Sequence, residues 1–154
     1  MANAIERFGE RTVERPHPTA LGPRHDAGPW RAADLRWDRD RGWLGDAAAR
    51  RPWTIELDEL TLELRPTVAG QVGLFPEHAA MLPWLRTRVG AAGDAPEVLN
   101  LFGATGHATL ALAVRGATVV HVDASRPTVA WARRNADRSG LADAAIRWIV
   151  DDVP

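Results

Sequence analysis

The chain has 154 residues, of which 45% are hydrophobic and 25% charged, a composition typical of a soluble globular protein of one domain or one and a half. It has no cysteine, which excludes disulfides, thiolate metal sites and thiol nucleophiles within these residues. All 19 basic residues are arginine, and the net charge of −1 excludes an overall positive field for nucleic acid. No apolar stretch approaches the roughly 20 residues of a membrane span and the N-terminus has no apolar signal core, so we expect a cytoplasmic protein with no membrane partner.

Residues 1–52 show the weakest pattern in the chain. A short strand is predicted over residues 12–15, ended by Pro16, and the prolines and glycines between residues 16 and 29 predict a loop. Apolar and basic side chains then interleave: Trp30, Leu35, Trp37 and Trp43 lie among Arg31, Arg36, Arg39 and Arg41. Such a segment could stack on RNA bases. Tryptophans in a thin β region more often form its core, and nearby aspartates (Asp34, Asp38, Asp40, Asp46) neutralise the arginines, so we favour the core.

Residues 53–65 predict a β-hairpin, because apolar and polar residues alternate on both sides of Asp58 and Glu59. Residues 66–76 predict a loop. A helix is expected from Pro76, with Glu77 well placed for the helix dipole and with Pro83 kinking or interrupting the helix.

The clearest pattern covers residues 97–123, which read as strand, turn, helix and strand. An apolar strand at 98–102 leads into Gly103-Ala104-Thr105-Gly106, where glycine permits positive φ angles and lets a ligand approach the backbone. A helix is expected to begin near 105–107 and to end at Gly116, followed by a strand at 118–122 that delivers Asp123. The 20 residues from Gly103 to Asp123 are the spacing at which a β-α-β unit puts an acid beside the ribose of a nucleotide.

The glycine turn is not the full dinucleotide pattern. Its glycines fall at Gly103 and Gly106 and no G-x-G-x-x-G exists, so a cofactor with an adenosine and no phosphates suits the turn better than a dinucleotide does. The structural alternative is a strand-turn-helix corner that binds nothing.

The pattern repeats once after Asp123. Ser125 is a good helix N-cap with Pro127 in the first turn, and Gly140 closes the helix. Residues 145–150 predict a third buried strand, which ends in Asp151-Asp152. Ligands of open parallel sheets collect at the carboxyl ends of the strands, so one acid can hold ribose hydroxyls while another accepts from an adenine amine.

Together the segments VLNLFGATG, HVDAS, VAWARRNADRSGL and IRWIVDDV resemble the class I S-adenosylmethionine (SAM)-dependent methyltransferases. The branch they are most similar to is the large-subunit ribosomal-RNA cytosine-C5 methyltransferases, which LRPTVAGQVGLFPEH and IERFGERTVERPHPTA also resemble. The resemblance implies SAM as cofactor and ribosomal RNA as substrate. It also implies an α/β fold: the first half of a Rossmann-like methyltransferase sheet at residues 76–154, preceded by a small β-rich region at residues 1–75.

The resemblance also assigns roles to individual residues. The methionine side of the cofactor would be lined by Asn100, Phe102, Gly103, Thr105 and Gly106. Asp123 would hold the ribose hydroxyls, Ala124 would lie against the adenine, and Asp152, or less favourably Asp151, would meet the adenine amine. Gln71, Leu74 and Phe75 would close the pocket. Gly103 stands where the family more often has alanine or cysteine, and His107 where it often has a second glycine; we interpret His107 as a surface or pocket-edge substitution.

The resemblance further implies a fourth strand, an Asp-Pro-Pro type loop and, in the cytosine-C5 branch, a cysteine nucleophile, none of which is in these residues. We therefore expect a truncated fragment that is inactive alone and self-associates through an open sheet edge, its last strand. Two alternatives stay open. One is a fragment of a NAD-dependent oxidoreductase, which would be expected to have the three-glycine turn, and the other is a non-catalytic binding or pseudo-enzyme module.

Overall fold

A computed structural model describes residues 3–18, 20 and 26–153. The chain divides into two compact units, one made of Met1–Ile55 with Glu63–Gly73 and the other of Glu56–Leu62 with Leu74–Pro154. The division near residue 73 lies close to the predicted domain boundary at residue 75, although residues 56–62 group with the second unit. No helix in the described ranges is both long and apolar enough to span a membrane.

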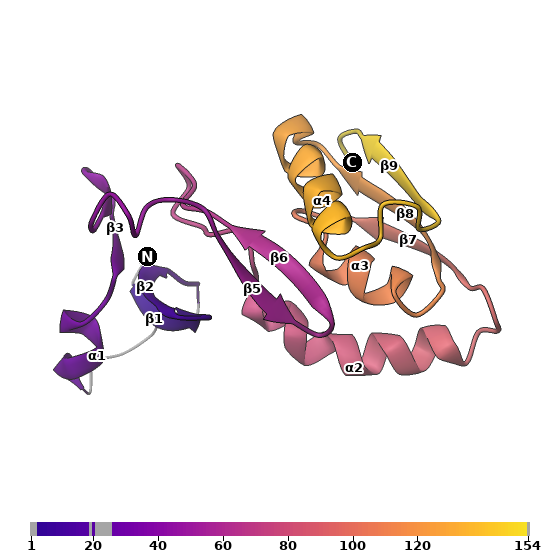
Figure 1. Cartoon of the computed structure of the whole chain (residues 1–154), viewed down its shortest axis with the longest axis horizontal. Coiled ribbons are helices and arrows are strands. Elements are labelled where there is room, and N and C mark those ends of the chain that lie inside the picture. The colour runs from indigo at the N-terminus through magenta and orange to yellow at the C-terminus, as the bar shows by residue number, and fades with distance from the viewer. Residues whose placement is uncertain (1–2, 19, 21–25, 154) are drawn as a thin grey trace. The chain divides into compact units, whose positions relative to one another are not determined.

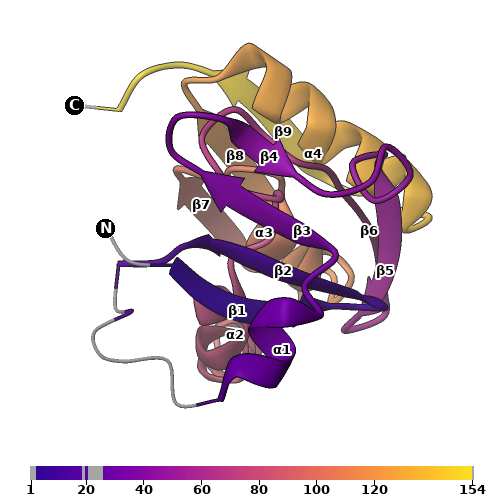
Figure 2. The ribbon, with the colours of Figure 1, turned by 90° about the vertical axis from the view of Figure 1, so that its left-hand side faces the viewer.

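The first unit contains a four-stranded sheet, seen from the front in Figure 2. Its strands are β1 (Asn3–Phe8), β2 (Arg11–Pro16), β3 (Leu35–Asp38) and β4 (Gly42–Leu44), in the order β1-β2-β3-β4. The β1/β2 and β3/β4 pairs are antiparallel, and β2 and β3 are parallel. Phe8, Val13 and Leu35 are buried, and the rings of Trp37 and Trp43 meet edge to face at 5.4 Å. The predicted strand at residues 12–15 is confirmed.

The predicted loop over residues 16–29 is wrong at its C-terminal end, where the short helix α1 (Ala27–Arg31) forms. The Asp26 carboxylate caps this helix by accepting from the Gly28 amide at 2.8 Å. The prolines and glycines of the segment predicted a loop, so the N-cap residue Asp26 was not recognised in the sequence. The glycine and proline at 22 and 23 lie outside the described residues. The carboxylates of Asp34 and Asp38 accept hydrogen bonds from backbone amides: Asp34 from Thr12, and Asp38 from Asp40 and Arg41.

The predicted hairpin is confirmed as β5 (Trp53–Leu57) and β6 (Leu60–Leu64). Its two-residue turn, Asp58-Glu59, has φ angles of 53° and 68°, the left-handed pair that matches the twist of a tight hairpin.

The second unit contains a parallel sheet with strands β7 (Glu97–Leu101), β8 (Thr118–Asp123) and β9 (Ile146–Val150), in the order β7-β8-β9. Helices α2 (Pro76–Gly90), α3 (His107–Ala113) and α4 (Arg126–Arg138) accompany it (Figure 1). The alternation of strands and helices along the chain confirms the predicted α/β fold class, with antiparallel pairs confined to the N-terminal β-rich region.

The core of the second unit lies on one face of this sheet. Val98, Val119 and Ile146 are in register across the three strands and pack against Leu112 of α3 and Leu85 of α2. Residues of β7 on the alternate positions face the other way, so that Leu99 is 62% and Leu101 40% exposed. One face of the sheet therefore carries the helices, and the apolar side chains of the other face of β7 remain open to solvent.

Helix α2 corrects one prediction. The helix runs unbroken for 15 residues through Pro83, so the expected interruption is wrong. Pro83 lies on the exposed side of the helix, where water can satisfy the carbonyl that loses its donor. Leu82 is fully buried beside it, whereas Trp84 is 57% exposed.

Candidate functional site

The candidate site is the turn between β7 and α3, residues 102–106. The strand ends at Leu101, and the turn holds Phe102, Ala104 and Gly106 at φ angles of 53°, 48° and 91°. Gly103 has no positive φ, so the predicted conformational reason for a glycine at this position is wrong. Phe102 and Ala104 are not glycine, and the left-handed conformation costs such residues free energy, a kind of strain that clusters at functional sites.

Asp123 fixes this turn from the neighbouring strand. One carboxylate oxygen accepts from the Ala104 amide at 3.0 Å and the other accepts from the Ser125 amide at 2.9 Å. The Gly103 amide donates to the Val122 carbonyl at 2.9 Å, which extends the pairing of β7 and β8 into the turn. Each oxygen of the half-buried carboxylate keeps acceptor capacity at the carboxyl end of the sheet.

A buried polar network lies beneath the turn. The Asn100 amide donates to Thr109 Oγ1 at 2.7 Å, and Thr109 Oγ1 is 2.8 Å from His121 Nδ1. His121 is fully buried, its ring is 4.8 Å from that of Trp148, and burial lowers its pKa against a smaller opposing effect of Asp123. Sequence reasoning missed Thr109 and His121, for which the only signals are a hydroxyl in an apolar helix and a histidine in an apolar strand.

Helix α4 holds the other end of the turn. Asn135, 1% exposed, donates to the Thr105 carbonyl at 2.9 Å, and a Cβ on Gly106 would lie 3.0 Å from Ala132. Glycine is therefore required at 106 both by the positive φ and by the close approach of α4.

His107 begins α3 and is only 4% exposed, so a surface placement is wrong and a placement at the pocket edge stays a prediction. The first turn of α3 packs toward the hairpin tip, which places His107 Nε2 at 3.7 Å from the Asp58 carboxylate. Burial lowers the pKa of His107 most, and His78 and Arg86 act in the same direction, whereas Asp58 raises it. His107 thus links the start of α3 to the hairpin.

The second acidic strand end lies beside the first. The Asp151 amide donates to the Asp123 carbonyl at 3.2 Å, and the Asp152 amide donates to the Asp151 carboxylate at 2.9 Å. Asp151, Asp152 and Ala124, the residue after Asp123, are all exposed. The structure therefore brings most of the predicted site residues to one edge of the sheet: Phe102, Gly103, Thr105, Gly106, Asp123, Ala124, Asp151 and Asp152.

The remaining predicted residues differ in their settings. The side-chain amide of Asn100 lies beneath the turn and donates to Thr109 Oγ1. Phe75 is the N-cap of α2, with its ring 5.5 Å from that of His78. Gln71 belongs to the first unit, where its side-chain oxygen accepts from Arg15. Their roles toward a cofactor stay predictions.

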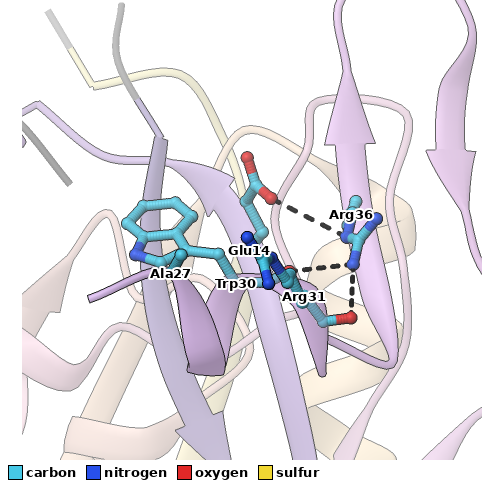
Figure 3. A pocket seen from close by; sticks show the side chains of 5 residues that line it. All are labelled: Glu14, Ala27, Trp30, Arg31 and Arg36. Atoms are coloured by element: carbon cyan, nitrogen blue, oxygen red, sulfur yellow. Dashed lines mark hydrogen bonds and ion pairs between the residues drawn. The ribbon is translucent and has the colours of Figure 1, made fainter. Parts of the chain in front are cut away.

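A separate pocket of about 360 Å³ lies in the first unit (Figure 3). Glu14, Ala27, Trp30, Arg31 and Arg36 line it. Arg36 Nη2 donates to the carbonyls of Trp30 and Arg31 at 2.8 and 2.7 Å, and its Nε is 3.9 Å from the Glu14 carboxylate. These contacts anchor α1 to the sheet, so Arg36 has a structural role in the pocket. Among the described residues, no three histidine, aspartate or glutamate side chains form a group that could hold a metal ion.

Comparison with known proteins points to one fold. No protein-family model and no curated protein matches the chain. Among solved structures, the SAM-dependent methyltransferase from Agrobacterium tumefaciens is 37% identical, with a TM-score of 0.88 over 98% of this chain and 50% of that protein. The chain therefore spans about half the length of that relative.

Two further structures share the fold at lower identity. A proposed SAM-dependent methyltransferase from Streptococcus mutans is 20% identical with a TM-score of 0.60, and SMU.776, a proposed methyltransferase solved with S-adenosylhomocysteine (SAH), is 22% identical with a TM-score of 0.62. Each match covers 77% of this chain and 31% of the other. The structural neighbours are thus SAM-dependent methyltransferases, and the chain shares their class I fold.

Proposed function

We propose that the chain is the donor-binding part of a SAM-dependent methyltransferase, with the cofactor held over the turn at 102–106. The observation that carries the proposal is the Asp123 carboxylate, locked to the turn through the Ala104 amide and presented at the carboxyl end of β8. The 37% identical methyltransferase from Agrobacterium tumefaciens supports the same function.

The residues of the turn fit an adenosine cofactor. Both Asp123 oxygens already accept one backbone amide, which fixes their direction, and each retains a lone pair for a ribose hydroxyl. The first turn of α3 follows a glycine cap with no side-chain hydrogen bond, so its leading amides are not consumed by a capping side chain. When bound, SAM supplies an electrophilic methyl group.

This chain's contribution to the reaction is positioning. Asp123 would orient the ribose, the acids after β9, which are hydrogen-bonded beside Asp123, would meet the adenine amine, and the turn would hold the donor before the acceptor arrives. Binding energy at these groups acts on the nonreacting part of the cofactor, which is where it can be used to orient the methyl group.

For the acceptor we propose RNA, at C5 of a ribosomal-RNA cytosine, on the strength of the sequence resemblance. That chemistry uses a cysteine nucleophile, and these 154 residues contain none. The nucleophile would therefore come from a segment or chain other than the one described, and the isolated chain is expected to bind the donor without transferring its methyl group.

Titration calorimetry of the purified chain with SAH tests the donor site, and NAD is the matched competitor because it shares the adenosine and adds a pyrophosphate. Binding of SAH with no comparable binding of NAD supports the proposal. Preference for NAD would favour the oxidoreductase alternative, and failure to bind either would favour a module with another role. Transfer of a methyl group to ribosomal RNA by the chain alone would overturn the proposed division of labour.

A further inference from the structure

The imidazole of His121 lies directly beneath Gly103. A Cβ on residue 103 would lie 2.4 Å from His121 Cε1 and 2.5 Å from Nδ1, distances that no side-chain carbon tolerates. Because Gly103 has no positive φ, an alanine there would be acceptable to the backbone. Glycine is therefore required at 103 by the histidine below it and not by the conformation of the turn.

The ring of His121 is held in place by its neighbours. Its exposed fraction is 0%, its Nδ1 is held at 2.8 Å from Thr109 Oγ1, and its ring packs against Trp148. Thr109 is itself fixed by the Asn100 amide at 2.7 Å. A side chain added at 103 would thus displace the turn, because the ring is anchored to both α3 and β9.

Two hydrogen bonds of the turn depend on the position of residue 103. The Gly103 amide pairs with the Val122 carbonyl, and the next amide, of Ala104, is held by the Asp123 carboxylate at 3.0 Å. A Cβ at 2.4 Å from His121 Cε1 lies about 1 Å inside ordinary contact distance, and a shift of residue 103 large enough to relieve this clash would weaken both bonds.

We infer that His121 is the positioning residue of this turn, and that Gly103 and His121 form one size-matched pair that places the Ala104 amide against Asp123. The inference rests on the proposed function, in which the turn and Asp123 hold SAM. It predicts that neither residue can be exchanged alone without loss of donor affinity, whereas a compensating exchange is tolerated.

A double-mutant cycle tests the pair, with SAH affinity measured by calorimetry for Gly103→Ala, His121→Ala and the double variant. Gly103→Ala is expected to weaken binding about 5- to 100-fold, the effect of overpacking by one methyl group. The double variant is expected to recover at least half of that loss on a logarithmic scale, since the methyl group enters the space the ring vacates. Where His121→Ala is too unstable to purify, His121→Val supplies a β-branched side chain, which strands favour, and removes Cε1 and Nδ1, the two ring atoms that lie nearest to a Cβ on residue 103.

Gly106→Ala is the matched control, because its Cβ would meet Ala132 and not His121. His121→Ala should not restore Gly106→Ala. In the ligand-free protein, the amide proton shift of Ala104 reports its bond to Asp123, and it should move in Gly103→Ala and return in the double variant. Multiplicative effects on affinity together with an unrestored Ala104 shift would overturn the inference. A wild-type chain that fails to bind SAH would overturn the proposed function alone, because the Ala104 shift still decides the pair.

Discussion

Asp123→Asn tests most directly whether Asp123 binds the cofactor or only holds the turn between β7 and α3. Asparagine has the same shape but only one acceptor oxygen, so its amide nitrogen would face one of two backbone donors, Ala104 or Ser125, that now bind a carboxylate. A hydrogen bond to a charged group contributes about 1.5–3 kcal/mol. Loss of one such bond to a ribose hydroxyl predicts roughly 10- to 100-fold weaker SAH binding.

The same substitution has a smaller effect on the folded state. One of the two bonds that Asp123 accepts, from Ala104 in the turn or from Ser125 before α4, is lost in the ligand-free chain, and because Asp123 is only half-buried we expect a decrease of about 1 kcal/mol in the free energy of unfolding. Calorimetry with SAH and urea denaturation measure the two quantities separately.

Asp143→Asn is the matched control, since Asp143 is an exposed carboxylate between α4 and β9 in the same unit. It should leave affinity and stability unchanged. A SAH analogue lacking both ribose hydroxyls should bind the wild type and Asp123→Asn with similar affinity. If Asp123→Asn binds SAH as tightly as the wild type, the assignment of Asp123 to the ribose is refuted.

Three further predictions follow from the second unit. Burial lowers the pKa of His107 and His121 below 6.5, so the unfolded chain takes up protons before the folded one; the free energy of unfolding should be constant with respect to them above about pH 7 and fall below about pH 6.5, by up to about 1.4 kcal/mol per histidine per pH unit. Urea denaturation across this pH range should show a weaker dependence of the free energy of unfolding on pH in His107→Gln than in the wild type. An unchanged dependence would contradict the lowered pKa of His107. Leu99 and Leu101 are exposed on the outer strand β7, so the chain should self-associate in sedimentation velocity and Leu99→Lys should reduce this, whereas a wild-type monomer at high concentration would contradict it. Ser125→Ala removes the cap on the Thr128 amide and should cost about 1 kcal/mol in thermal or urea unfolding, with Ser125→Asp neutral; equal stability of all three proteins would refute the cap.

The second unit could be predicted from sequence because its signals are local. Apolar runs bounded by glycine set β7, β8 and β9 within a residue or so, and Ser125 and Gly140 correctly mark the ends of α4. The position of Asp123 beside the turn also follows from spacing, because parallel neighbouring strands end at the same edge.

What the sequence could not supply are the effects of distant neighbours. Gly103 looks like a glycine needed for a left-handed turn, but Phe102 and Ala104 take those angles and His121, 18 positions later, excludes the side chain. His107 looks exposed at the start of a helix until the hairpin tip brings Asp58 to it.

The same limit applies to the exposed edge. The sequence indicates the last strand as unpaired, but the strand order makes β7 the other outer strand, and it carries the larger exposed apolar side chains. Strand order depends on pairing between residues 21 positions apart (Glu97 with Thr118) and 27 positions apart (Val119 with Ile146), which no local pattern encodes.

The central claim is that the turn at 102–106 and Asp123 bind SAM, and titration of the unmodified chain with SAH in parallel with NAD tests it most directly. We expect saturable one-to-one binding of SAH and no comparable binding of NAD. Absence of SAH binding by a folded chain, or tighter binding of NAD, would contradict the claim.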